Sequence, residues 1–222
     1  MSEARMQEPN GSDLSTRWSR LGQLESGSAE AWRWFLDRYR GYVATRLRYL
    51  LRDADAAEAF WGYLLEKNVF ARADRSRPFR AFLNGVVRNY AHALRRDDAR
   101  WRTAETDPVA SAAPDAEIRD WSLTLLDNAL AALRTVDPRA WRALVAFYGL
   151  GGSPELGASA IGEELSLKGN AVHALLHRAR ARLGRKLLAE IRQTVSTSAE
   201  LEAETALVRA ALDAAGVRAA SF

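Results

Sequence analysis

At 222 residues, with 48% hydrophobic and 27% charged side chains and a formal net charge of +4, the chain has the composition of a globular protein. It contains no cysteine, which excludes disulfides, a thiolate nucleophile and cysteine-based zinc sites. No apolar stretch approaches the roughly 18 residues that a membrane span needs, so we expect a cytoplasmic protein. Abundant Ala, Leu, Arg and Glu, with few Gly and Pro, predict an all-α fold.

The first expected domain covers residues 14–102, where apolar residues recur every three or four positions and so predict amphipathic helices. Ser28 suits the N-cap of one helix, because its hydroxyl can accept the hydrogen bond of an orphan amide. Another helix is expected over Asp55–Asn68. Pro78 then suits the first turn of a long helix that is half apolar and half basic.

Basic residues are concentrated in two segments that an acidic segment separates. Nine Arg against three Asp give residues 72–102 a net charge of +6, and seven Lys or Arg against one Glu give residues 168–192 the same charge. Residues 103–121 carry five acids against one Arg, net −4. Because apolar periodicity is absent there, we expect residues 103–120 to be a flexible acidic linker between two small helical domains.

Residues 121–192 predict a helix-turn-helix domain. Asp137 and Pro138 form a helix start, and Ser166 stands in a tight turn where glycine would most easily take a positive φ. The tail, residues 193–222, could contain a weakly amphipathic helix. The expected elements are helices over residues 123–134, 138–148, 158–165, 168–191 and 199–215.

Both basic segments suit nucleic acid. The second helix of a helix-turn-helix reads the major groove, where Asn can pair with adenine and Lys with guanine. The upstream segment mixes Arg with aromatic residues, which suit unpaired bases as well as phosphates. The alternative is that these charges are merely solvated. The candidate DNA-binding residues are Arg80, Arg88, Asn89, His92, Arg95, Arg96, Lys168, Asn170, His173, His177, Arg178 and Arg180.

Two blocks of sequence carry a family resemblance. The first comprises TRWSRLGQLESGSAEAWRWFLDRYRGYV (16–43), DADAAEAFWGYLLEKNVFARAD (53–74) and FRAFLNGVVRNYAHALRR (79–96). The second comprises DPRAWRALVAFYGL (137–150) and AIGEELSLKGNAVHALLHRARARLGRKL (160–187). In this order they resemble the second-region and fourth-region domains of extracytoplasmic-function (ECF) sigma factors of RNA polymerase.

The resemblance implies a transcription initiation factor with no catalytic residue, metal or cofactor. The first domain would dock on core RNA polymerase, with Asp55, Glu58 and Phe60 as contacts, and open the minus-ten element onto its melted non-template strand. The second would bind the minus-thirty-five element as double-stranded DNA through residues 168–180. The resemblance also leaves room for a controlling anti-sigma factor, and it implies no membrane partner.

The sequence departs from the family pattern at one place that matters. The usual polymerase-contacting run is Asp-Leu-x-Gln followed by an acid, whereas residues 55–59 read DAAEA. An alternative is therefore a sigma-derived helix-turn-helix regulator that binds DNA without recruiting polymerase productively. A third interpretation concerns the segment after Val195, which could be a regulatory or partner-binding helix.

Overall fold

The computed structural model describes residues 16–51, 56–74, 78–101 and 114–217, and over these ranges the chain is helical with no strand. The all-α expectation is therefore confirmed. Among the described helices none is long and apolar enough to cross a membrane. The elements are α1 (Thr16–Glu25), α2 (Ala29–Leu51), α3 (Ala56–Glu66), the 3₁₀ turn η2 (Val69–Arg72), α4 (Phe79–Trp101), α5 (Pro114–Val136), α6 (Pro138–Tyr148), the 3₁₀ turn η3 (Leu150–Gly152), α7 (Ala158–Leu165), α8 (Gly169–Arg192) and α9 (Ser198–Ala214).

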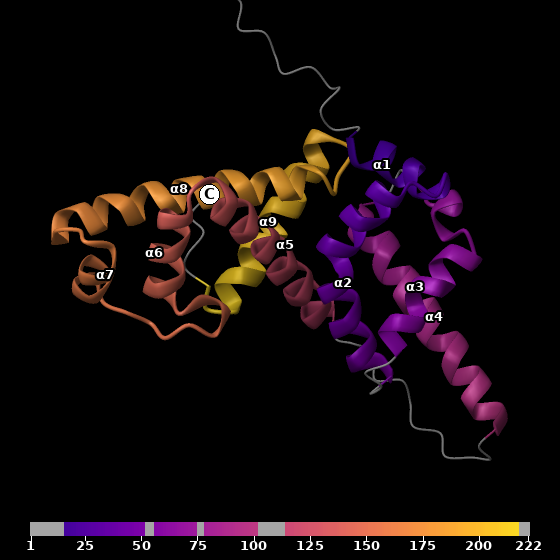
Figure 1. The fold of residues 1–222 in the computed structure, drawn as a ribbon. Coiled ribbons are helices and arrows are strands. Elements are labelled where there is room, and N and C mark those ends of the chain that lie inside the picture. The colour runs from indigo at the N-terminus through magenta and orange to yellow at the C-terminus, as the bar shows by residue number, and fades with distance from the viewer. Residues whose placement is uncertain (1–15, 52–55, 75–77, 102–113, 218–222) are drawn as a thin grey trace, which may run out of the picture.

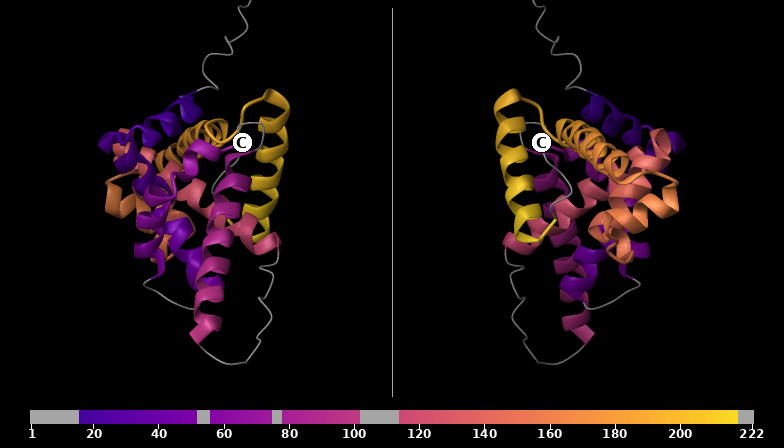
Figure 2. Two further views of the ribbon diagram at one scale, coloured as in Figure 1. Left: turned by 90° about the vertical axis from the view of Figure 1, so that its right-hand side faces the viewer. Right: turned by 90° about the vertical axis from the view of Figure 1, so that its left-hand side faces the viewer.

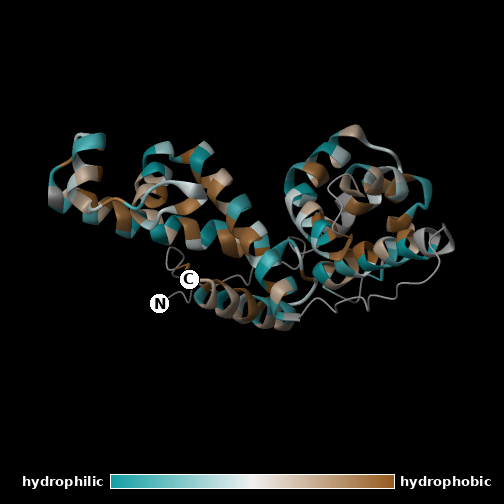
Figure 3. Ribbon diagram, turned by 90° about the horizontal axis from the view of Figure 1, so that it is seen from below, coloured by the Kyte–Doolittle hydropathy of each residue, from teal (hydrophilic) through white to brown (hydrophobic). Residues whose placement is uncertain are grey.

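Helices α1–α4, which we call the N-terminal half, lie together at one side of the molecule (Figure 1). They enclose a core that contains many aromatic side chains. Helix α2 presents Phe35, Tyr39, Val43 and Leu47 at four-residue spacing, and all four side chains are fully buried. This spacing lines one face of a helix, which is why the pattern was readable in the sequence. Figure 3 shows the same alternation as hydrophobic and hydrophilic segments that follow each other along the helices.

Helices α5–α9 form the C-terminal half. In it α8 packs along α5, α6 and α7, while α9 packs on α5 and α8. Figure 2 shows α9 as the yellow helix at one edge of the molecule. Helices α7 and α8 are the pair for which the sequence predicts a helix-turn-helix. The buried face of α8 is formed by Val172, Leu176, Ala179 and Leu183.

The turn between α7 and α8 is built as the sequence required. Ser166 lies in the left-handed region at φ 54° and ψ 48°, so a non-glycine residue takes the positive φ. The turn also depends on Gly162, because a Cβ there would lie 2.7 Å from the carbonyl oxygen of Leu167. The amide of Leu167 in turn donates to the carbonyl of Gly162 at 2.7 Å. A side chain at position 162 would push the two helices apart.

The described part of the expected acidic linker is not a tether. Helix α5 begins at Pro114, well before the expected start at residue 123, and its first turns pack against α2. Trp121 is fully buried there, with its ring stacked on Tyr39 at 5.8 Å and edge-on to Tyr42 at 5.3 Å. Residues 102–113 lie outside the described part. One contact network therefore joins the two halves, and a division into two separate domains is not visible in it.

The N-cap of α6 gives a testable stability effect. The side chain of Asp137 accepts a hydrogen bond from the amide of Ala140 at 3.0 Å and also pairs with Arg182. Asp137→Ala is expected to lower the free energy of unfolding by about 1 kcal/mol, because an orphan amide loses its partner. Asp137→Asn, which caps equally well but breaks the ion pair, should cost about half of that. Urea denaturation of both variants checks the order, and equal losses would contradict the capping role.

Candidate nucleic-acid interface

The first candidate surface is the exposed face at the start of α8. Lys168 at the N-cap and the outward positions of the first turns are exposed, while the opposite face is buried against α5, α6 and α7. These side chains can donate hydrogen bonds to phosphate oxygens, and they can donate to or accept from the edges of bases. The start of α8 lies beside α7 at one end of the molecule (Figure 1). The exposed candidates are Lys168, Asn170, His173, His177 and Arg178.

Arg180 differs from these residues because aromatic side chains of α6 hold it. Its Nε donates to the hydroxyl of Tyr148 at 2.5 Å. Its guanidinium also lies 5.4 Å from the ring centroid of Tyr148 and 5.7 Å from that of Phe147. Such cation–π contacts fix the direction of an arginine without neutralising its charge. Arg180 is therefore a positioned cation beside the exposed face.

The second candidate surface lies on α4. Arg88, Asn89, His92 and Arg96 are exposed and fall on one side of the helix, whereas the other side packs in the N-terminal half. Arg95 does not belong to this face, because it is half-buried and donates to the carbonyl of Leu50 at the end of α2. A cation at that carbonyl stabilises a helix C-terminus, so Arg95 ties α4 to α2.

Arg80 is also engaged within the protein. Its side chain is 19% exposed and forms ion pairs with Glu117 of α5 at 3.0 Å and with Glu204 of α9 at 3.1 Å. The amide of Asn84 donates to the same Glu117 carboxylate. Two carboxylates therefore bind the guanidinium of Arg80, which the sequence analysis named as a candidate DNA contact. No local sequence pattern indicates these partners, because both lie far from Arg80 in the chain.

The candidate polymerase contacts lie on and next to α3. Asp55 is outside the described residues. Glu58 is exposed and pairs with Arg40 of α2. Phe60 is fully buried, and its ring packs edge-on to Trp61 at 5.3 Å and to Tyr90 at 5.2 Å. The ring of Phe60 is thus part of the core and is not presented to a partner.

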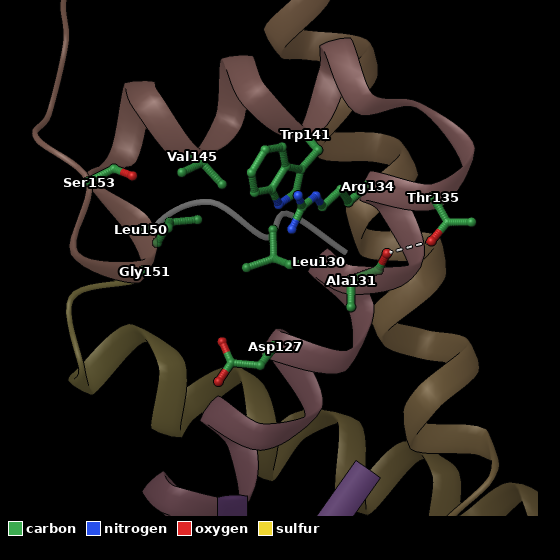
Figure 4. A pocket seen from close by; sticks show the side chains of 10 residues that line it. All are labelled: Asp127, Leu130, Ala131, Arg134, Thr135, Trp141, Val145, Leu150, Gly151 and Ser153. Atoms are coloured by element: carbon green, nitrogen blue, oxygen red, sulfur yellow. Dashed lines mark hydrogen bonds between the residues drawn. The ribbon is translucent and has the colours of Figure 1, made fainter. Parts of the chain in front are cut away.

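One hollow of the C-terminal half was not expected from the sequence. It measures about 770 Å³ and lies between α5, α6 and η3 (Figure 4). Trp141 and Arg134 stand together on one side, with the guanidinium 4.8 Å from the ring centroid, and Asp127 stands across the hollow from them. Partial desolvation raises the pKa of the Asp127 carboxyl above its ordinary value. Among the described residues no group of three or more His, Cys, Asp or Glu side chains could hold a metal ion.

Comparison with known proteins adds no relative to this geometry: no family model, no curated protein and no solved structure matches the chain.

Proposed function

We propose that this protein is an ECF-type sigma factor that directs RNA polymerase to specific promoters and starts transcription. The observation that supports it most is the exposed polar and basic face of α8, the second helix of a helix-turn-helix. In this interpretation the C-terminal half binds the minus-thirty-five element as duplex. Lys168, Asn170 and His173 would face base edges, while Arg178 and Arg180 would contact phosphates.

The N-terminal half would act on the minus-ten element. The exposed row on α4 combines cations with an amide and an imidazole, which suits phosphates and splayed bases together. Arg88, Asn89, His92 and Arg96 carry this role. Arg80 and Arg95 do not share this role, because Arg80 pairs with two carboxylates and Arg95 donates to a backbone carbonyl.

A second candidate function is a DNA-binding regulator that no longer recruits polymerase productively. One observation favours it: the ring of Phe60 is buried, so α3 does not offer this side chain to a polymerase surface. The two candidates share the DNA-binding faces and differ only in whether polymerase joins them.

Reconstitution with purified core RNA polymerase separates these candidates. DNA ligands are first selected from a random duplex library, and templates that carry them are then transcribed with core enzyme with and without the protein. A sigma factor co-purifies with core enzyme and yields run-off transcripts that depend on the protein. A regulator binds the same DNA and yields none.

Two substitutions on α8 should change DNA binding in different ways. Asn170→Ala is expected to cost about 1–3 kcal/mol on the selected site and to relax the base preference at one position. Arg178→Ala should weaken binding to all duplexes alike and reduce the slope of log affinity against log salt by about 1, because one phosphate contact is lost. Fluorescence anisotropy over a salt series measures both effects. Arg33→Ala, at an exposed position of α2, is the matched control.

A further inference from the structure

The hollow between α5, α6 and η3 has the size of a site for a small ligand. Its volume of about 770 Å³ falls within the roughly 300–1,000 Å³ of pockets that hold small molecules. Two of its walls belong to helices that pack on each other, so the packing of α5 on α6 sets its width. None of the residues that line it belongs to α8, so the hollow is distinct from the candidate DNA-binding face of that helix.

The third wall is a turn that hydrogen bonds hold in place. Gly151 and Gly152 have φ angles of 63° and 78°, a left-handed conformation that residues with a Cβ rarely adopt. Beyond them the amide of Leu156 donates to the carbonyl of Ala146 at 2.7 Å, which ties the chain back to α6. The hollow is therefore a feature of the backbone and does not depend on the rotamer of one exposed side chain.

Two opposite charges stand on the wall that α5 provides. Asp127 and Arg134 are seven residues apart, which places them within about 20° of each other around the helix axis and roughly 10.5 Å apart along it. Figure 4 shows the carboxylate of Asp127 on one side of the hollow and the guanidinium of Arg134 on the other. Among the described residues neither side chain has an oppositely charged partner. The hollow thus presents one negative and one positive group, two helical turns apart.

Asp127 is suited to receive a cation. Neighbouring atoms partly desolvate its carboxyl, and this desolvation alone raises the pKa of the carboxyl above its ordinary value. A cation close to the carboxyl would lower that pKa, so no described cation lies near enough to compensate the charge. The side chain is nevertheless reachable from solvent. A ligand ammonium that donates to this carboxylate would form a charge-assisted hydrogen bond that the protein itself does not supply.

Arg134 is suited to receive an anion. Its guanidinium lies 4.8 Å from the ring centroid of Trp141, and this cation–π contact restricts the side chain without neutralising it. The N–H groups of a guanidinium can still donate in pairs to a carboxylate. Leu130, Val145 and Leu150 supply apolar surface to the same hollow. The lining therefore fits a molecule that is charged at both ends and apolar in the middle.

We propose that the hollow binds a small zwitterion of the size of a tripeptide, with its anionic end on Arg134, its cationic end on Asp127 and its apolar middle against Trp141. Three extended residues span about 10 Å, at 3.3–3.6 Å per residue, which matches the two helical turns between the two charges. The site goes beyond the proposed function and does not depend on it, because binding requires neither DNA nor polymerase.

The site is tested by titrating the full chain with the tripeptides Ala-Leu-Ala and Ala-Phe-Ala, both free at the two ends. Shifts of the indole N–H resonance of Trp141 in NMR spectra report binding. At least one peptide is expected to bind with a Kd below about 1 mM, and its N-acetylated and C-amidated forms about tenfold more weakly, since each has lost one charge. Absence of saturable binding by both free peptides would overturn the proposal, and so would equal affinity for the free and blocked forms.

Two substitutions assign the ends of the bound peptide. Asp127→Asn is expected to weaken binding of the free peptide about tenfold and to leave the affinity for the N-acetylated form unchanged, because that form has no ammonium to lose. Arg134→Gln should do the same for the free and the C-amidated forms. A loss that is equal for free and blocked peptides would show that a substitution acts through the fold, which contradicts a direct contact. Asp213→Asn and Arg33→Gln, at exposed positions of α9 and α2, are the matched controls and should bind as the wild type does.

Discussion

Trp121→Ala is expected to lower the free energy of unfolding by about 3–5 kcal/mol, the loss typical of truncating a fully buried indole. The indole is fully buried between Tyr39, Tyr42 and Phe79, so its removal leaves a cavity that helices from both halves line. The midpoint and slope of urea denaturation measure the loss. Trp121→Phe should lose less, because the indole N–H is buried and has no hydrogen-bond partner among the residues that the structure describes.

Val136→Ala provides the control on the same helix. Val136 is 68% exposed at the other end of α5, so its truncation should change the free energy of unfolding by no more than about 0.5 kcal/mol. If both substitutions cost the same, the start of α5 does not pack against α2. The start of α5 would then be a tether between the two halves, as the acidic composition suggested.

Gly162→Ala is expected to destabilise the C-terminal half by roughly 1–3 kcal/mol and to abolish selective DNA binding. The added Cβ would stand 2.7 Å from the carbonyl oxygen of Leu167 and 3.4 Å from a methyl carbon of Val172, so the turn that positions α8 must shift. Denaturation measures the first effect and anisotropy on the selected duplex measures the second.

The same change at an open helical glycine should act in the opposite direction. A Cβ at Gly41 in α2 would meet nothing within 4 Å, and alanine favours the helix by about 0.5–1 kcal/mol over glycine. Gly41→Ala is therefore expected to stabilise the protein and leave DNA binding unchanged. Stabilisation by Gly162→Ala as well would show that α7 and α8 are not in close contact.

Local patterns predicted the parts of the fold that local physics decides. The apolar period of α2, the Asp137–Pro138 start of α6 and the strained turn at Ser166 each follow from a few neighbouring residues. The exposed candidates on α8 follow from the same period, since the residues between the apolar positions must face outward.

Long-range partners explain the sequence predictions that the structure changes. Glu117 and Asp120 were predicted to belong to a flexible acidic linker, yet they lie on one side of α5 with Trp121 next to them and pair with Arg80 and Arg46. The sequence did contain one indication that this segment packs against the protein: Trp121, a residue of a type that is usually buried, follows the acidic residues. Only the tertiary structure shows that the acids have partners, because those arginines lie on α2 and α4, remote in the chain.

The arginines of α4 illustrate the same limit from the other side. Arg80, Arg88 and Arg95 are alike in a sequence, but only Arg88 is exposed. Arg80 pairs with carboxylates, and Arg95 donates to a backbone carbonyl at the end of α2. A basic segment thus predicts that a helix carries an exposed basic face, but it does not tell which of its arginines lie on that face.

The continuity of α5 also sets an angular relation between the halves. A helix advances about 100° around its axis with every residue, so the length of the stretch between Trp121 and the end of α5 determines which way the helix-turn-helix points relative to α4. One inserted residue would swing α8 to a different side of the molecule, while seven would return it to within about 20° of its present direction. The length of α5 therefore fixes the angle between the basic face of α4 and that of α8.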